Sequence, residues 1–221
     1  MQTTWDAVDQ YFGQHLLPSD AALTAALQDS AAGGLPEIQV SACQGQFLHL
    51  LARAIGARRI LEIGTLGGYS AICLARALPP DGRLITLELN PKAADLARRN
   101  FERAGIGHLI EVRVGAALDS LPMIAAESAG PFDLIFIDAD KPNNAAYFDW
   151  AVRLGRPGTT IIVDNVVRDG EVANAASQDA SVLGTRLLIE RVARDSRVRA
   201  TAIQTVGAKG YDGFLFATIG G

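Results

Sequence analysis

Cysteine is scarce in this sequence, with two in 221 residues. Cys43 and Cys73 show no paired spacing, so the sequence gives no sign of a disulfide framework. Each falls in an apolar, helix-like pattern, and free cysteine is among the most buried residue types. Because disulfides are rare in the cytosol, we expect both cysteines to be reduced core residues of a cytoplasmic protein.

Basic residues are not in excess, and long apolar runs are absent. The net charge is −4, whereas proteins that bind the nucleic-acid backbone usually carry a basic patch, so we expect no nucleic-acid partner. Every apolar run is much shorter than the about 18 residues of a membrane-spanning helix, so we expect no membrane partner. The opening stretch, MQTTWDAVDQYF, carries acids and no basic segment, which does not fit a signal peptide.

Hydrophobic residues make up 49% of the chain and charged residues 20%, as in a compact folded protein. The length suits one large-core domain, and no repeat or linker divides it, so we predict a single domain over residues 1–221. Residues 1–35 form a separate helical segment within it.

Three helical patterns precede the rest of the fold, at residues 3–16, 20–32 and 43–56. Pro18 separates the first two, and Ser19 is the expected N-cap of the second. Trp5, Tyr11 and Phe12 form an apolar stripe on the first helix. This stripe predicts a packing face, either within the chain or at a dimer contact.

Strand and helix patterns then alternate. We expect strands at 58–64, 82–89, 109–115, 132–139 and 159–165, and helices at 69–78, 91–105, 117–127, 144–155 and 181–195. Nearly continuous apolar strands alternating with helices indicate a parallel sheet covered on both faces. Two further strands, 197–205 and 211–219, have so short a connection that only an antiparallel hairpin can join them. The predicted fold is therefore α/β: a Rossmann-like, doubly wound, mostly parallel sheet with a C-terminal antiparallel hairpin.

The first strand ends in a glycine-rich loop, LEIGTLGGYS, in which Gly64, Gly67 and Gly68 allow a tight turn and close approach of a ligand. The spacing is not the G-x-G-x-x-G of dinucleotide-binding proteins. Glu62 would repel a pyrophosphate but suits a cationic amino-acid group. Glu88 ends the next strand, where an acid can accept both hydroxyls of a ribose. The alternative is that the glycines simply form a turn and that Glu88 is a solvated residue at the end of its strand.

Two apolar strands end abruptly in charge, in FDLIFIDADK and TTIIVDN. Asp138, Asp164 and Asn165 supply oxygen ligands at the ends of strands that should be adjacent, which suits a hard cation such as Mg²⁺. No histidine or cysteine joins them, which argues against a zinc site. Helix capping is the alternative use of either aspartate. Asp140 is interpreted as a supporting or capping residue.

Lys141 lies three residues beyond Asp138. A nearby cation disfavours the ammonium form of a lysine, which can then accept a proton as a base. A surface lysine that merely follows a strand is the alternative interpretation.

The segments LEIGTLGGYS, LITLELN, FIDADK and IIVDN, in this order, resemble the cation-dependent O-methyltransferases of the catechol and caffeoyl-coenzyme A type, in particular the small bacterial members. The resemblance runs from about Pro36 to the C-terminus. It implies a class I methyltransferase fold, S-adenosylmethionine (SAM) as methyl donor, and a divalent cation: Mg²⁺, or Mn²⁺ or Ca²⁺. It also implies a homodimer and a small vicinal-diol aromatic acceptor.

The resemblance also assigns roles by position. Lys141 would be the catalytic base, and the cation would bind Asp138, Asp164 and Asn165. Glu62 and the backbone of Gly64 and Thr65 would hold the methionine end of SAM, with Ser70 at its carboxylate and Glu88 at its ribose. The complete set of expected donor contacts is Val40, Glu62, Gly64, Thr65, Gly68, Tyr69, Ser70, Glu88, Ala116 and Asp138.

Other functions remain open at this point. A methyltransferase for another acceptor class, a nicotinamide-dependent dehydrogenase on a similar sheet, and a non-catalytic binding protein that keeps the donor pocket are the alternatives. The absence of G-x-G-x-x-G and the presence of Glu62 argue against the dehydrogenase. The intact set of Asp138, Lys141, Asp164 and Asn165 argues against a loss of catalysis. The acceptor itself is not specified, although residues 166–180 and the N-terminal helices should shape its pocket.

Overall fold

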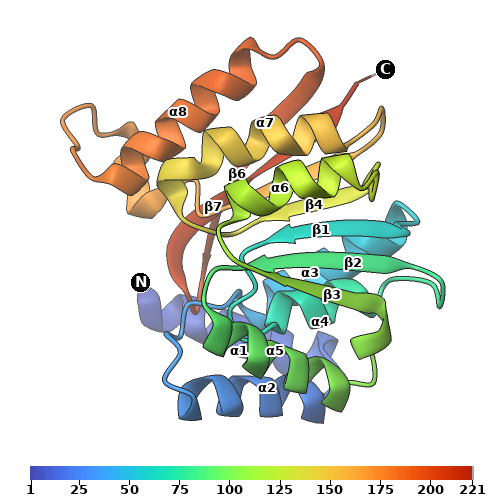
Figure 1. The fold of residues 1–221 in the computed structure, drawn as a ribbon. Coiled ribbons are helices and arrows are strands. Elements are labelled where there is room, and N and C mark those ends of the chain that lie inside the picture. Colours follow the sequence, from blue (N-terminus) through green and yellow to red (C-terminus); the bar gives the residue numbers. More distant parts are fainter. Residues whose placement is uncertain (221) are drawn as a thin grey trace.

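A seven-stranded sheet forms the centre of the computed structural model, which describes residues 1–220 (Figure 1). The strand order is β3-β2-β1-β4-β5-β7-β6. The strands are β1 (Arg59–Ile63), β2 (Arg83–Glu88), β3 (Ile110–Val114), β4 (Leu134–Ile137), β5 (Thr160–Asp164), β6 (Val198–Gly207) and β7 (Gly210–Ile219). The first five are parallel to one another, and β7 lies antiparallel between β5 and β6. The predicted doubly wound sheet with a C-terminal antiparallel hairpin is confirmed.

Helices cover both faces of this sheet, as Figure 1 shows. One face carries α6 (Ala117–Ala126), α7 (Asn144–Leu154) and α8 (Ala180–Arg194), and the other carries α3 (Ala42–Ala54), α4 (Tyr69–Ala75) and α5 (Pro91–Arg103). Alternate residues of each central strand enter opposite apolar clusters, for example Leu61 and Ile60 of β1. This double burial explains why the strands read as continuous apolar runs.

The strand order reverses between β1 and β4, which lie side by side although β2 and β3 separate them in the chain. In open α/β sheets the carboxyl ends of the strands at such a switch point form the ligand-binding crevice. The fold therefore brings the loop after β1 next to the charged end of β4.

Two helices form the N-terminal segment, α1 (Gln2–Leu16) and α2 (Ala21–Ala32). The expected N-cap Ser19 is wrong by one residue, because Asp20 caps α2 by accepting from the backbone N–H groups of Ala22 and Leu23, each at 3.0 Å. Asp20 also pairs with Arg76, which follows α4. The same carboxylate thus starts the helix and ties it to the domain.

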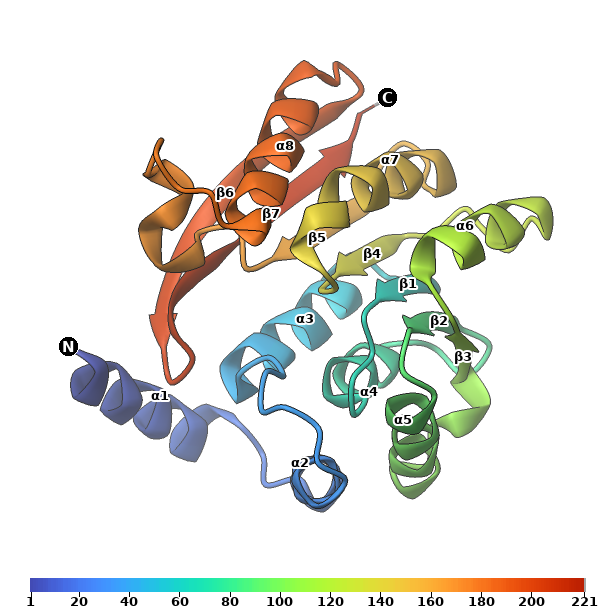
Figure 2. The same cartoon turned by 60° about the vertical axis from the view of Figure 1, so that its left-hand side comes forward.

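Helix α1 lies apart from the sheet, beside the tip of the β6–β7 hairpin (Figure 2). Gln2 Nε2 donates to the Gly207 carbonyl at 2.9 Å, and the Ala208 N–H donates to Asp9 Oδ2 at 2.8 Å. No residue of α1 is buried, and Tyr11 and Phe12 of the predicted stripe are exposed. Over residues 1–220, no helix combines the length and apolar character needed to cross a membrane.

Candidate active site

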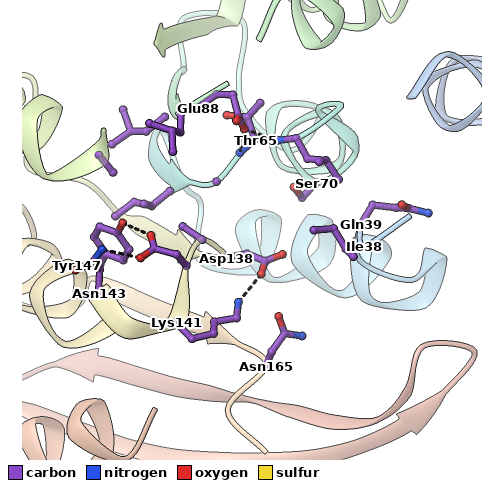
Figure 3. A pocket seen from close by; sticks show the side chains of 18 of the residues that line it. Ile38, Gln39, Thr65, Ser70, Glu88, Asp138, Lys141, Asn143, Tyr147 and Asn165 are labelled. Carbon is purple, nitrogen blue, oxygen red and sulfur yellow. Dashed lines mark hydrogen bonds and ion pairs between the residues drawn. The ribbon is translucent and has the colours of Figure 1, made fainter. Parts of the chain in front are cut away.

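A cavity of about 680 Å³ opens at the carboxyl ends of β1, β2, β4 and β5 (Figure 3). Most of the predicted site residues line it: Val40, Gly64, Thr65, Tyr69, Ser70, Glu88, Ala116, Asp138, Lys141 and Asn165. These residues come from segments far apart in the sequence. Val40 and Ala116, which were predicted from the family resemblance alone, are among the residues that line the cavity.

The glycine-rich loop after β1 contains two glycines with positive φ. Gly64 has φ 99°, and a Cβ there would lie 2.1 Å from the Asp138 carbonyl oxygen, so glycine lets the ends of β1 and β4 approach. Gly68 is the N-cap of α4 with φ 86°, and a Cβ there would meet the Phe101 ring at 2.4 Å. Gly68 does not belong to the cavity lining, so its visible contribution is the close packing of α4 on α5.

Glu88 fixes this loop from the end of β2. Its Oε2 accepts from the backbone N–H groups of Thr65 at 3.2 Å and Leu66 at 2.7 Å, and its Oε1 accepts from Asn90 N–H at 2.8 Å. The carboxylate is therefore held in one orientation at the cavity wall. A rigid acid in this position suits bidentate recognition of neighbouring hydroxyls on a bound ligand.

Glu62 is fully buried behind the loop and is not itself part of the cavity wall. Ser70 Oγ donates to its Oε1 at 2.7 Å, and Thr86 Oγ1 donates to its Oε2 at 2.6 Å. Burial raises the pKa of Glu62 to about 8, although the two hydroxyls oppose this shift. Thr86 also contacts Thr65 Oγ1 at 2.5 Å, so Glu62 supports two residues that do face the cavity.

The charged ends of β4 and β5 meet at the other end of the cavity (Figure 3). Lys141 Nζ donates to Asp138 Oδ1 at 2.9 Å, and both side chains are largely buried. Asp164 is 4% exposed and makes no ion pair within residues 1–220. Burial, and then the charge of Asp138, raises the pKa of Asp164 to about 7. Asn165 follows with φ 57°, a left-handed conformation that is uncommon outside glycine.

Helix capping does not explain these aspartates. In the described chain the Asp164 carboxylate accepts from the N–H of its own neighbour Asn165, at 2.9 Å, and Asp138 accepts from Lys141. Asp140 has a supporting role, since it accepts from Tyr147 Oη at 2.5 Å and Asn143 Nδ2 at 2.6 Å. Both contacts fix the turn that leads from β4 into α7.

The oxygen-bearing side chains at this end of the cavity fit a hard divalent cation. Asp138 and Asp164 lie close enough for the charge of Asp138 to raise the pKa of Asp164. Lys141, which pairs with Asp138, offsets this effect only in part, so the buried Asp164 is incompletely compensated. Within residues 1–220 no group of three or more His, Cys, Asp or Glu side chains could hold a metal. A cation here would therefore bind two carboxylates, the Asn165 amide oxygen and oxygens from water or substrate, which is a typical set for Mg²⁺.

Comparison with known proteins identifies the class. A family model described as O-methyltransferase matches residues 19–214, so the chain belongs to this O-methyltransferase family. A catechol O-methyltransferase of Mycobacterium tuberculosis is 54% identical over 212 residues, which cover 96% of this chain and 94% of the relative. A catechol O-methyltransferase of Niastella koreensis is 49% identical over 215 residues, covering 97% of each.

Solved structures agree with this class. The O-methyltransferase from Bacillus cereus, in complex with SAH, superimposes with a TM-score of 0.98 at 57% identity and covers 99% of this chain and 100% of that one. An O-methyltransferase from Streptomyces achromogenes, involved in tomaymycin synthesis and in complex with SAM, gives 0.96 at 51% identity, with 100% and 99% covered. The predicted family, enzyme class and class I methyltransferase fold are confirmed, and the dehydrogenase alternative loses its support.

Some residues of the site were not predicted from the sequence. Thr86 had a signal, because it is a polar residue within an apolar strand and pairs in register with Glu62. Tyr147 and Arg168 also line the cavity. Tyr147 lies in an ordinary helical pattern, and Arg168 in a polar loop, so neither could be placed before the chain was folded.

Proposed function

We propose that this enzyme transfers the methyl group of SAM to one hydroxyl of a small aromatic vicinal diol, and that it requires a divalent cation. The observation that carries the proposal is the convergence of Asp138, Lys141 and Asn165 in the same cavity as the glycine loop and Glu88. Asp164 is the buried last residue of β5, directly before Asn165 in the chain. The cavity thus has one end suited to a nucleoside and another suited to a cation and a base.

The donor would lie along the loop between Gly64 and Ser70. Glu88 accepts the ribose hydroxyls, and Ala116, at the start of α6, lies near the adenine. Val40 and Tyr69 close the cavity around the methionine end, where Thr65 and Ser70 supply backbone and hydroxyl groups. Glu62 acts from behind through Ser70 and Thr86. The SAM and SAH complexes of the two similar structures support this use of the cavity.

The cation would be held by Asp138, Asp164 and Asn165. Mg²⁺ fits this set, with Mn²⁺ or Ca²⁺ as alternatives. When bound, the cation would attract the neighbouring oxygens of the diol and lower the pKa of the hydroxyl that reacts. The names of the two similar catechol O-methyltransferases support a catechol-type acceptor.

Lys141 is the residue positioned to take the proton. Its amine is largely buried, lines the cavity and is oriented by Asp138 Oδ1. Removal of the hydroxyl proton by Lys141 leaves an oxygen that attacks the methyl carbon of SAM, and the carbon–sulfur bond breaks to release SAH. Holding the oxygen, methyl carbon and sulfur in line is the main contribution of the cavity walls.

The assembly we propose is a cytoplasmic homodimer. Cys43 and Cys73 are free thiols, as in proteins of a reducing compartment. Leu27 and Ser30 of α2 line the cavity, so the N-terminal segment already helps to enclose it. The exposed apolar side chains of α1 then supply a surface for a second copy.

Transfer of labelled methyl from SAM to catechol, with Mg²⁺ present and the product identified by mass spectrometry, tests the function. We expect a mono-O-methylated catechol. Lys141→Met should lower turnover by roughly 10²–10⁴-fold, because a positioned base contributes about that much. Lys92→Met removes a lysine from the exposed start of α5 and should leave turnover unchanged. Equal rates for the two variants would remove Lys141 from the mechanism.

A further inference from the structure

Arg168 is a second cationic side chain in the cavity lining, besides Lys141. It starts the short helix η3 (Arg168–Ala173), three residues after Asn165. Arg168 therefore lies in the segment that follows the proposed cation ligands of β5, at the end of the cavity where the acceptor would bind. None of the donor contacts described above involves it.

The charge of Arg168 is only weakly compensated within the described chain. Its nearest carboxylate is Asp212 on β7, with 4.0 Å between Nη1 and Oδ2, which makes this the longest ion pair in residues 1–220. Its Nε is buried and has no hydrogen-bond partner among the described residues. The Arg168 side chain as a whole is 33% exposed, so its terminal nitrogens, and not the enclosed Nε, are the donors that a ligand in the cavity can reach.

The backbone holds Arg168 in an unusual conformation. Arg168 has φ 56° and Asp169 has φ 55°, both in the left-handed region that residues other than glycine rarely occupy. Asp212 Oδ1 stabilises the turn by accepting from the N–H groups of Val167 and Arg168, each at 3.0 Å. Because Asp212 Oδ1 is engaged by the backbone, this carboxylate fixes the loop more than it neutralises the side chain. Strain maintained in this way is typical of a residue placed for function.

The other charged groups of the cavity already have partners or roles. Lys141 is bound to Asp138, Asp140 to Tyr147 and Asn143, and Glu88 to the loop after β1. Arg168 is left as the cation available to a substrate. A guanidinium presents paired N–H donors that match a carboxylate.

We propose that Arg168 binds a carboxylate on the acceptor, so that this enzyme favours acidic vicinal diols over neutral ones. The inference rests on the proposed function and adds the substrate class to it. Arg168 acts on binding and selectivity, while Lys141 and the cation ligands act on the reacting hydroxyls.

Caffeic acid and its methyl ester provide a matched pair, since they share the ring, diol and side chain and differ in the negative charge. We expect the wild-type enzyme to have the higher kcat/KM for the acid. In Arg168→Gln the ratio of kcat/KM for the acid to kcat/KM for the ester should fall by about tenfold or more. A loss of that size is expected when a hydrogen bond to a charged group is removed. Arg168→Lys should recover part of the ratio, because it keeps the charge but loses the paired donors.

Arg194→Gln is the control, because it removes the same charge from an exposed position at the end of α8 and should leave the ratio unchanged. Calorimetry of caffeic acid with SAH and Mg²⁺ present should show the same loss of affinity in Arg168→Gln without turnover. One outcome is that the wild type methylates both diols while Arg168→Gln shows the same acid-to-ester ratio of kcat/KM as Arg194→Gln. That result would overturn this inference and leave the proposed function standing. If the wild type methylates catechol but neither of these two diols, this inference is overturned. If it methylates none of the three, the proposed function fails and the inference fails with it.

Discussion

At the scale of single residues, Glu62 is the most unusual group in the molecule. It is a fully buried carboxyl within the sheet, and its only described side-chain partners are the hydroxyls of Ser70 and Thr86. Burial raises the pKa of Glu62 from 4.5 to about 8. Between these two values the folded chain keeps a proton that the unfolded chain has lost.

The sign of the pH dependence follows from this difference. A raised pKa in the folded state means that the stabilising contribution is present at low pH and is lost as pH rises towards 8. We predict that the free energy of unfolding of the wild-type protein, measured by urea denaturation with a chelator present, decreases from pH 5.5 to pH 8.5 by roughly a few kcal/mol.

Glu62→Gln keeps the shape of the side chain and removes the titration, so its decrease over this pH range should be smaller. Asp164, whose pKa burial raises to about 7, remains in both proteins, so the difference between the two curves reports Glu62. Parallel curves would show that Glu62 is already ionised in the folded protein.

Residue roles were only partly predictable. Asp138 and Lys141 stood out because charge follows an apolar strand, and the structure places both at the cavity. Thr86 and Asp212 were missed because each acts through a neighbour that only the fold brings close: Glu62 for the first and the backbone of Arg168 for the second. The assigned contacts with donor and cation stay predictions.

At the scale of elements, helix α8 packs against the short helix η2 (Lys141–Asn143), which follows β4. A Cβ at Gly184 would come within 2.4 Å of the Lys141 carbonyl oxygen and 2.6 Å of Pro142 Cα. Both are backbone atoms, which cannot move aside as a flexible side chain does. The missing side chain at Gly184 therefore lets α8 pack directly on the turn that presents Lys141.

Gly184→Ala should displace that turn. We predict a loss of roughly 1–3 kcal/mol in the free energy of unfolding, as for other overpacked sites, together with a fall in turnover. Gly13→Ala is the matched control, because nothing lies within 4 Å of a Cβ there and the residue is inside helix α1. It should be neutral or stabilise the protein by up to about 1 kcal/mol. Similar stabilities for the two variants would show that α8 can shift without consequence.

Elements were the most predictable level. Every expected strand and helix is present, because apolar strands between two helical layers leave a strong pattern. The N-cap of α2 was wrong by one residue because Ser19 and Asp20 are both good caps, and the pairing of Asp20 with Arg76 favours the second. The short helix η3 was not predicted, since its left-handed residues depend on Asp212.

At the scale of the whole molecule, one surface has no partner within the described chain. Val8, Tyr11, Phe12 and Leu16 of α1 are all more than 40% exposed, and Ile203 and Val206 are exposed on the edge strand β6. Apolar surface gathered in this way usually marks an interaction site. The stripe on α1 therefore favours a contact between two copies over packing within one chain.

We predict a homodimer that a double substitution, Tyr11→Glu with Phe12→Glu, converts to a monomer, because the added charges would be buried without partners. Light scattering at micromolar concentration measures the state, and circular dichroism checks that the variant is folded. Lys209→Glu changes a charge in the β6–β7 turn instead of the apolar stripe and is a control for charge alone. A clean wild-type monomer under these conditions would contradict the predicted homodimer.

The single-domain organisation over residues 1–221 also stays a prediction.

The global arrangement could be predicted only in part. The alternation of strands and helices predicted the parallel sheet. Local sequence patterns do not specify the strand order, however. The glycine loop reaches Asp138 because β1 and β4 are neighbours in the sheet. The parts of the cavity wall outside the strand ends were the least predictable. They come from α2, the residues before α3, and the segment after β5, whose local sequences do not specify how they meet.

In the function that we propose, the charged ends of β4 and β5 hold one divalent cation on which catalysis depends. We would measure methyl transfer from SAM to catechol in excess chelator, followed by titration with Mg²⁺, for the wild type, Asp164→Asn and a control, Asp149→Asn. Asp149 lies on α7, outside the cavity lining, and pairs with Arg191 at the surface. We predict that activity disappears with chelator and returns with Mg²⁺ in the wild type and the control, whereas Asp164→Asn needs far more cation because one carboxylate ligand is gone. Full activity of the wild type in excess chelator would show that these side chains hold no essential cation, even if SAM binds as proposed.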